Sequence, residues 1–225
     1  MHVTGVPSGR RHWIWRCHID ASRPDRLVWK HLAAALPRYD ASIFSMAAFT
    51  RPLACPIFLT PPSIDPLSEK NCAIPETERL ETLTRLGIDP ERPLLLQVSR
   101  FDRFKDPLGV IAAYRLLKPY YPQLQLVLAG GSADDDPEGE EVVREVLERA
   151  EDDRDVKVLL LPADAHRTIN ALQRSAIIVL QKSLREGFGL TVAEALWKGK
   201  PVIGGACGGI VLQVHDYHTG FLVHS

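Results

Sequence analysis

Between an apolar strand expected at residues 177–180 and a helix expected to end near Lys198 lies the sequence Arg185-Glu186-Gly187-Phe188-Gly189-Leu190-Thr191-Val192-Ala193-Glu194. A strand, a glycine-rich turn and a helix start in this order are typical of one β-α unit of a parallel sheet. Backbone N–H groups at residues 187–191 would be unpaired at a helix N-terminus, and glycine has no Cβ to keep an anion away. The stretch therefore predicts both a fold class and a site for an anion such as a diphosphate.

Apolar runs alternate with helical segments on both sides of this stretch. The expected strands of this region are residues 94–98, 124–128, 156–161, 177–180, 201–203 and 221–223. Continuously apolar strands with helices between them indicate an α/β fold, a doubly wound parallel sheet covered on both faces. Two helix ends agree, because Asp106 before Pro107 is a typical N-cap and Gly199 a typical helix stop.

The beginning of the chain predicts fewer elements. Strands are expected at residues 13–19, 41–46 and 54–59, and a helix should run from a capping box at Ser22 and Asp25 to about Leu36. Four prolines within residues 61–75 then mark a linker. We expect part of an N-terminal domain at residues 1–60, the linker at 61–75, and a C-terminal domain at 76–225 that ends on a strand without its covering helix.

Composition excludes several classes of protein. The chain has 225 residues, 45% hydrophobic and 24% charged, which is ordinary for a soluble globular protein. Its net charge of -1 gives no basic field for nucleic acid or a membrane surface. No apolar run approaches the roughly 18 residues of a membrane helix. The four cysteines lack metal-ligand spacing, so we expect free thiols and a cytoplasmic protein.

A second segment with chemical potential follows the strand at residues 94–98. Arg100 and Lys105 would lie at the carboxyl end of that strand, where open α/β sheets bind ligands. Two cations there can hold a diphosphate and stabilise its charge as it departs. The alternative is a solvated loop in which Arg100 and Lys105 pair with Asp102 and Asp106, worth about 0 to 1 kcal/mol per exposed pair.

Two carboxylates, Glu186 and Glu194, frame the predicted anion site. A carboxylate accepts hydrogen bonds, so each is suited to sugar hydroxyls rather than to phosphate. The alternative is that the glycines only turn the chain and that Glu194 pairs with Lys198 one helical turn later. A nicotinamide-dependent dehydrogenase is discounted, because the turn after residues 94–98 lacks Gly-x-Gly-x-x-Gly.

The two segments together resemble the retaining family-4 glycosyltransferases, which have two facing nucleotide-binding-like domains (the GT-B architecture). That family has Arg-x4-Lys after one strand and Glu-x7-Glu after a later one, as at residues 100–105 and 186–194 here. Shorter phrases stand in the family's order: Leu128-Ala129-Gly130-Gly131, Glu194-Ala195-Leu196, Gly199-Lys200-Pro201-Val202, Gly208-Gly209 and Thr219-Gly220-Phe221-Leu222-Val223.

Within that family, three phrases look like the trehalose glycosyltransferring synthases. They are Trp13-Ile14-Trp15-Arg16-Cys17-His18-Ile19-Asp20, Pro61-Pro62-Ser63-Ile64-Asp65-Pro66-Leu67-Ser68-Glu69-Lys70-Asn71 and Arg185-Glu186-Gly187-Phe188-Gly189. The resemblance implies retaining transfer of glucose from a nucleotide-glucose to glucose, which gives trehalose. A trehalose phosphorylase-like enzyme and a non-catalytic nucleotide-binding remnant are the alternatives.

The resemblance also implies residue roles. Arg100 and Lys105 would bind the diphosphate, Glu186 the hydroxyls of the donor glucose, and Glu194 the ribose hydroxyls. The nucleotide would further contact Gly187, Phe188, Gly189, Leu190 and Thr191. His18 would touch the donor sugar near the reacting carbon, its alternative being a hydrogen-bonded core histidine.

The resemblance requires no cofactor and no Mg²⁺, and a homodimer is compatible with it. Asp134, Asp135 and Asp136 resemble a metal-binding aspartate cluster, but acidic residues are favoured by the helix dipole at the helix start that follows them. The family has further sequence before Trp13 and after Val223. We therefore expect donor binding to survive better than transfer in this chain.

Overall fold

The computed structural model describes residues 11–131 and 137–224, so the aspartate cluster at 134–136 lies outside the described residues. The chain divides into two compact units, Met1–Pro62 and Ser63–Ser225, and each is described by itself.

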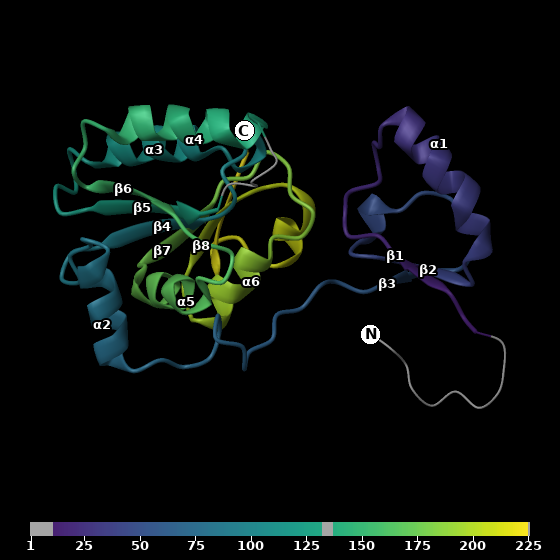
Figure 1. The fold of residues 1–225 in the computed structure, drawn as a ribbon, viewed down its shortest axis with the longest axis horizontal. Helices are drawn as coiled ribbons and strands as arrows, with labels where there is room; N and C mark the ends of the chain where they lie inside the picture. The colour runs from purple at the N-terminus through teal and green to yellow at the C-terminus, as the bar shows by residue number, and fades with distance from the viewer. Residues whose placement is uncertain (1–10, 132–136, 225) are drawn as a thin grey trace. The chain divides into compact units, whose positions relative to one another are not determined.

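The first unit is a small parallel α/β arrangement (Figure 1). Its three strands lie in the order β1-β2-β3. Its elements are β1 (Ile14–Arg16), α1 (Arg26–Ala35), η1 (Leu36–Arg38), β2 (Ala41–Phe44), η2 (Ala47–Phe49) and β3 (Ile57–Leu59). Phe44 is fully buried and meets the ring of Trp15 edge-on, with 5.6 Å between ring centroids. This aromatic pair belongs to the unit's apolar cluster, in which Phe44 is buried and Trp15 packs against it.

Helix α1 begins later than predicted. The carboxylate of Asp25 accepts the N–H groups of Leu27 and Val28 at 2.8 and 3.0 Å, so Asp25 is the N-cap. The predicted capping box from Ser22 to Asp25 is therefore wrong. The cause is local, because Asp20 accepts the N–H of Ser22 at 2.8 Å and holds that stretch in an Asx turn.

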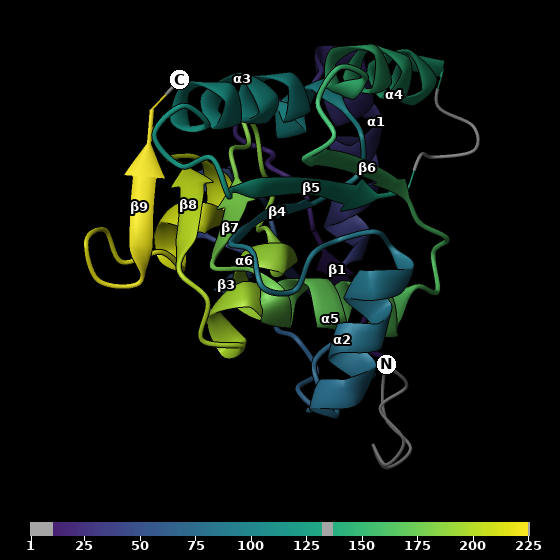
Figure 2. The same ribbon diagram turned by 90° about the vertical axis from the view of Figure 1, so that its left-hand side faces the viewer.

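The second unit contains a six-stranded, all-parallel sheet in the order β6-β5-β4-β7-β8-β9. Its strands are β4 (Leu94–Val98), β5 (Gln125–Gly130), β6 (Val156–Leu160), β7 (Ile178–Gln181), β8 (Val202–Gly205) and β9 (Gly220–Val223). Figure 2 shows β8 and β9 side by side at one edge, pointing the same way. The expected doubly wound parallel sheet is confirmed.

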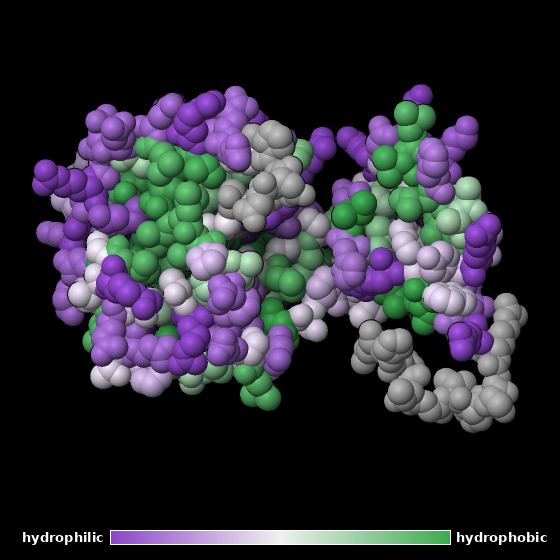
Figure 3. Space-filling model, in the orientation of Figure 1, coloured by the Kyte–Doolittle hydropathy of each residue, from purple (hydrophilic) through white to green (hydrophobic). Residues whose placement is uncertain are grey.

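Helices cover both faces of this sheet (Figure 1). One face carries α2 (Glu76–Arg85), α5 (His166–Ser175) and α6 (Leu190–Trp197), and the other carries α3 (Pro107–Leu117) and α4 (Pro137–Ala150). Each layer has its own apolar cluster, because the strands present buried Leu and Val side chains to both sides. Along the top of the unit, over α3 and α4, hydrophilic side chains dominate the surface (Figure 3).

Two predicted helix ends are confirmed. Asp106 accepts the N–H of Gly109 at 3.1 Å and caps α3, with Pro107 at its first position. Asp106 has a φ of 48°, because it also ends the short helix η3 (Arg103–Lys105). At the end of α6, Gly199 has a φ of 69° and its N–H contacts the carbonyl of Leu196 at 3.0 Å, which is a glycine stop.

Within residues 11–131 and 137–224, no helix is both long enough and apolar enough to cross a bilayer. The four cysteines, Cys17, Cys55, Cys72 and Cys207, are free thiols.

Candidate functional site

The candidate site forms where the strand order of the sheet reverses. Strands β4 and β7 are neighbours, and the chain leaves them toward opposite sides of the sheet. The loops after such strands border a crevice in which α/β proteins bind ligands. Here the two loops also bond to each other, since the N–H of Leu184 donates to the carbonyl of Phe104 at 2.7 Å.

One ion pair joins the two segments singled out in the sequence. Nζ of Lys105 lies 2.6 Å from Oε2 of Glu186, although the residues are 81 positions apart. Their side chains are only 16% and 10% exposed. The same carboxylate oxygen accepts from Gln181 Nε2 and Ser183 Oγ, both at 3.2 Å. The structure therefore brings a cation and a hydrogen-bonded carboxylate together in one half-enclosed place.

Two further side-chain contacts join the loop after β4 to the loop after β7. Lys182, directly after β7, forms an ion pair with Asp106 at the start of α3. The guanidinium of Arg185 lies over the ring of Phe104, 5.3 Å from its centroid. Because three side-chain contacts and a backbone hydrogen bond connect the loops, Lys105 and Glu186 occupy a preorganised arrangement.

Two glycines next to Glu186, one in the glycine-rich turn and one in η4, lie where other residues would not fit. Gly189 has a φ of 82° and is the N-cap of α6. Gly208, with a φ of 50°, belongs to η4 (Gly208–Leu212), and a Cβ there would stand 1.8 Å from the carbonyl oxygen of Glu186. Any other residue at position 208 would therefore displace the turn.

The carbonyl groups of the turn are held from one side. Nε2 of Gln213 donates to the carbonyls of Phe188, Gly189 and Gly209 at 2.6, 3.3 and 3.2 Å. Among the residues that the structure describes, no acceptor contacts the N–H groups of Leu190 and Thr191, which open α6. Free N–H groups at a helix N-terminus favour an anion.

Arg100 lies in the β4 loop but points its charge into solvent. Its side chain is 67% exposed, and it pairs with Asp102 at 3.4 Å. The solvated-loop alternative thus describes Arg100. It fails for Lys105, which bonds to Glu186, and for Asp106, which bonds to Lys182.

Glu194 has partners that the sequence did not predict. Its carboxylate forms an ion pair with Nζ of Lys70 at 2.8 Å and accepts a hydrogen bond from Nε2 of Gln173 at 3.1 Å, and the residue is only 4% exposed. Nζ of Lys198 reaches the backbone carbonyl of Glu194, at 3.4 Å, rather than its carboxylate. The alternative of a Glu194–Lys198 side-chain pair is therefore wrong. Burial lowers the pKa of Lys198 to about 8.

His18 belongs to the first unit, two residues beyond the end of β1, and its side chain is exposed. The alternative of a core histidine is therefore wrong. The core residue in this stretch is its neighbour Cys17, which is 4% exposed and whose pKa is raised by burial.

Three glutamines that the sequence analysis missed support the site loops. Gln97 donates to the carbonyl of Lys105 at 2.7 Å, Gln181 contacts Glu186, and Gln213 holds the glycine turn. Within the described residues, the buried Oε1 atom of each has no hydrogen-bond partner. A signal existed for two of them, because Gln97 and Gln181 are polar residues near the carboxyl ends of apolar strands.

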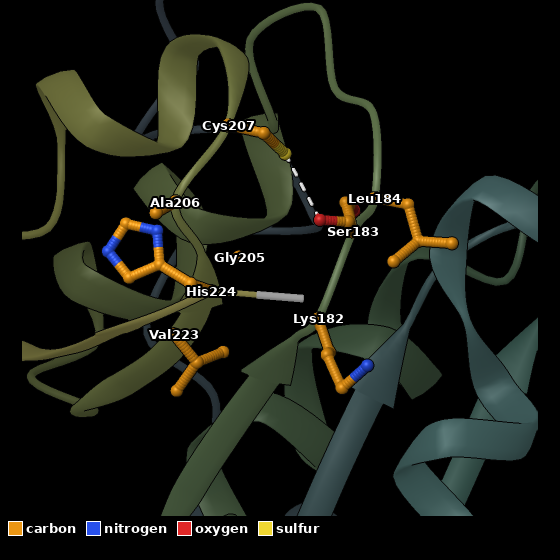
Figure 4. A pocket seen from close by; sticks show the side chains of 8 residues that line it. All are labelled: Lys182, Ser183, Leu184, Gly205, Ala206, Cys207, Val223 and His224. Carbon is orange, nitrogen blue, oxygen red and sulfur yellow. Dashed lines mark hydrogen bonds between the residues drawn. The ribbon is translucent and has the colours of Figure 1, made fainter.

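A small cavity of about 110 Å³ adjoins the site at the carboxyl ends of β7, β8 and β9 (Figure 4). It is lined by Lys182, Ser183, Leu184, Gly205, Ala206, Cys207, Val223 and His224. The thiol of Cys207 donates to the carbonyl of Ser183 at 3.1 Å, and burial raises its pKa. Pockets for drug-sized ligands measure about 300 to 1,000 Å³, so this cavity is too small for a nucleotide sugar.

In the part of the chain that the structure describes, no three His, Cys, Asp or Glu side chains gather as a metal site would require.

Comparison with known proteins identifies the family. The model of the glycosyl transferases group 1 matches residues 78–225, which is more than half of the chain. The chain belongs to the group 1 glycosyl transferases. In addition, the model of the trehalose synthase N-terminal domain matches residues 2–51. The expected family and GT-B-like fold are thus confirmed.

Similar proteins include two curated trehalose synthases. The chain is 49% identical to that of Thermococcus litoralis over 217 residues, covering 95% of this chain and 53% of the relative. It is 46% identical to that of Rubrobacter xylanophilus over 213 residues, covering 93% of this chain and 51% of the relative. The chain spans about half the length of the curated relatives it matches.

Solved structures show the same fold. Sucrose-phosphate synthase from Thermosynechococcus elongatus superposes with a TM-score of 0.76 at 23% identity, covering 96% of this chain and 56% of that one. Anabaena HepE in complex with UDP and glucose superposes with a TM-score of 0.75 at 21% identity, covering 95% and 58%.

Proposed function

We propose that this chain provides the donor site of a retaining glucosyl transfer from a nucleotide-glucose to glucose, with trehalose as product. The observation that carries the proposal is the Lys105–Glu186 pair, 2.6 Å apart beside the glycine-rich turn. It joins the two motifs in which the family resemblance resides. The match of residues 2–51 to the trehalose synthase N-terminal domain and the 49% identity to a trehalose synthase support glucose as the acceptor.

In the proposed reaction, the bond between C1 of glucose and the diphosphate oxygen breaks, and a bond from the acceptor hydroxyl oxygen to C1 forms. The diphosphate takes the proton of the acceptor hydroxyl. Lys105, Arg100 and the N–H groups at the start of α6 stabilise the negative charge on the departing diphosphate. Glu186 accepts a hydrogen bond from a hydroxyl of the donor glucose at Oε1, which the N–H of Gly187 also contacts at 3.1 Å, because Lys105, Gln181 and Ser183 all donate to Oε2. The family resemblance is what supports a role for His18 near C1 of the donor sugar.

Retention follows from attack on the face that the diphosphate leaves. A double displacement would need a carboxylate nucleophile about 5 Å from a second carboxyl group. Glu186 does not suit that role, because Lys105, Gln181 and Ser183 already bond to its carboxylate. No metal takes part in the proposed reaction.

Product analysis tests the proposal. The purified chain, in excess over donor so that a slow reaction is seen, is incubated in EDTA with labelled glucose and either ADP-glucose or UDP-glucose. We expect α,α-linked trehalose and one equivalent of nucleoside diphosphate, and loss of both with Glu186→Gln. An inverted linkage, or a reaction that needs a divalent metal, contradicts the mechanism.

A phosphorolytic reaction is a second candidate. The chain is 34% identical over 149 residues to a trehalose phosphorylase of Pleurotus pulmonarius, covering 59% of this chain and 20% of that relative. The same site would then hold inorganic phosphate in place of a nucleoside diphosphate. Glucose 1-phosphate formed from trehalose and phosphate, with no reaction of nucleotide-glucose, favours this candidate over the first.

A further inference from the structure

Residues 63–72, expected from their prolines to be part of a linker, are packed onto α5 and α6 of the second unit. Asn170 of α5 is fully buried, and its Nδ2 donates to the carbonyls of Glu69 and Cys72, both at 2.8 Å. Ile64 and Pro66 border an apolar groove with Leu196 and Trp197 of α6. This segment therefore has a defined place beside the helix that carries Glu194.

The segment directs one charge at Glu194. Nζ of Lys70 lies 2.8 Å from Oε1 of Glu194. The lysine side chain is 29% exposed and the glutamate side chain 5%. A carboxylate buried to this extent is costly unless it is paired and hydrogen-bonded. Lys70 supplies the compensating charge within the described residues.

The second oxygen of the carboxylate is fixed by a buried chain of hydrogen bonds. Oε2 of Glu194 accepts Gln173 Nε2 at 3.1 Å. Oε1 of Gln173 accepts Lys198 Nζ at 2.7 Å, and Lys198 also donates to Asn71 Oδ1 at 2.8 Å. Gln173 is fully buried and Asn71 is 3% exposed. Because each oxygen has its own donor, the plane of the carboxylate is set.

We propose that Lys70 is a positioning residue, which orients the carboxylate of Glu194 to accept hydrogen bonds from the ribose diol of the donor nucleotide. The inference rests on the proposed function. A carboxylate offers about four acceptor sites, so two remain after Lys70 and Gln173 are bound, one for each hydroxyl of a vicinal diol. Because the Glu194 carboxylate is oriented before the ligand binds, binding does not have to include the entropy cost of ordering this side chain.

The test measures ribose discrimination in the intact chain. Calorimetry gives the affinities for ADP and UDP and for their 2′,3′-dideoxy counterparts. The variants are Lys70→Met, Lys70→Gln and Lys70→Arg. Lys118→Met is the matched control, because Lys118 is 25% exposed and pairs with Asp155 at 2.6 Å against the other face of the sheet. A thermal melt of each variant measures stability separately.

We expect Lys70→Met to lose about tenfold or more of its affinity for the ribonucleotide, with the dideoxy affinity held within about twofold. Lys70→Gln should lose less, and Lys70→Arg should retain discrimination. Lys118→Met should lower the melting temperature without changing discrimination. These results support positioning, because a merely structural lysine would affect both ligands alike.

Three results overturn the inference. Equal losses for ribose and dideoxy ligands make Lys70 structural, and an increased ribonucleotide affinity means that Lys70 covers Glu194. If Lys70→Met does not fold, unchanged discrimination in Lys70→Gln overturns the inference equally. A parent chain that binds neither diphosphate refutes the proposed function itself, which separates that failure from these.

Discussion

Replacing Arg100 separates binding from folding more cleanly than any other change at the site. The Arg100 side chain is 67% exposed, and within the described residues its one ion pair, to Asp102, spans 3.4 Å. Such a pair contributes about 0 to 1 kcal/mol to stability. Arg100→Ala should therefore fold like the parent chain, with a melting temperature close to it.

The effect on a diphosphate should be larger. Hydrogen bonds to a charged group contribute about 1.5 to 3 kcal/mol, which is roughly 10- to 150-fold in affinity. Because Arg100 is exposed and its charge is screened, the loss should lie near tenfold, and it should shrink as salt rises above about 0.15 M. The free nucleoside carries no charge for Arg100 to meet, so its affinity should be unchanged.

Calorimetry with ADP, UDP, adenosine and uridine measures these losses. Arg103→Ala is the control, because Arg103 is an exposed arginine of the same loop that pairs with Glu138, Glu141 and Glu145 of α4. It should leave both affinities unchanged. Equal losses for nucleoside and diphosphate with Arg100→Ala, or equal losses with the two variants, would refute the role of Arg100 as a diphosphate ligand.

Three further predictions concern charge at other positions. Glu186→Gln should impair discrimination among sugar donors, whereas Glu194→Gln should weaken ribonucleotides more than deoxy counterparts; identical ligand profiles in calorimetry contradict this division. The pKa of Lys198 falls to about 8 on burial, so between about pH 8 and 10.5 the unfolded chain binds the additional proton. The free energy of unfolding of the parent chain should therefore rise over this pH range by about 1 kcal/mol more than that of Lys198→Met, after allowance for solvent screening. Urea unfolding at several pH values measures both, and parallel pH profiles of the two proteins would contradict the prediction. Hydrogen bonds from Arg92, and to a smaller extent from Lys118, lower the pKa of Asp155 to about 2. The parent chain should therefore be more stable than Asp155→Asn above about pH 4, and this difference in the free energy of unfolding should disappear toward pH 2. Acid unfolding curves of the two proteins that do not converge would contradict this prediction.

Much of the fold was predictable because its signals are local. The apolar runs of the second unit gave the strands, and a proline after Asp106 gave a helix start that the structure confirms. The capping box at Ser22 failed for an equally local reason. Asp20 accepts the N–H of Ser22 and holds that stretch in a turn, so the helix begins only after Asp25, which accepts the N–H groups of Leu27 and Val28.

The site was predictable only to the level of the loops. The rule that ligands bind at strand carboxyl ends brings Arg100, Lys105 and Glu186 to one place, but it does not pair them. That Lys105 rather than Arg100 meets Glu186 depends on which side chain the packing buries. Local spacing favoured Lys198 as the partner of Glu194, whereas Lys70 comes from a distant segment whose position no helical spacing encodes.

An amide NMR titration of the labelled chain with ADP-glucose and UDP-glucose in EDTA tests for the proposed diphosphate site between the loops after β4 and β7. We expect shifts concentrated at residues 100–106 and 186–191, largest at Leu190 and Thr191, whose N–H groups would meet the anion. The same shifts should appear with the nucleoside diphosphate and not with glucose. Shifts centred elsewhere in the second unit, or none without a divalent metal, would contradict the proposed site.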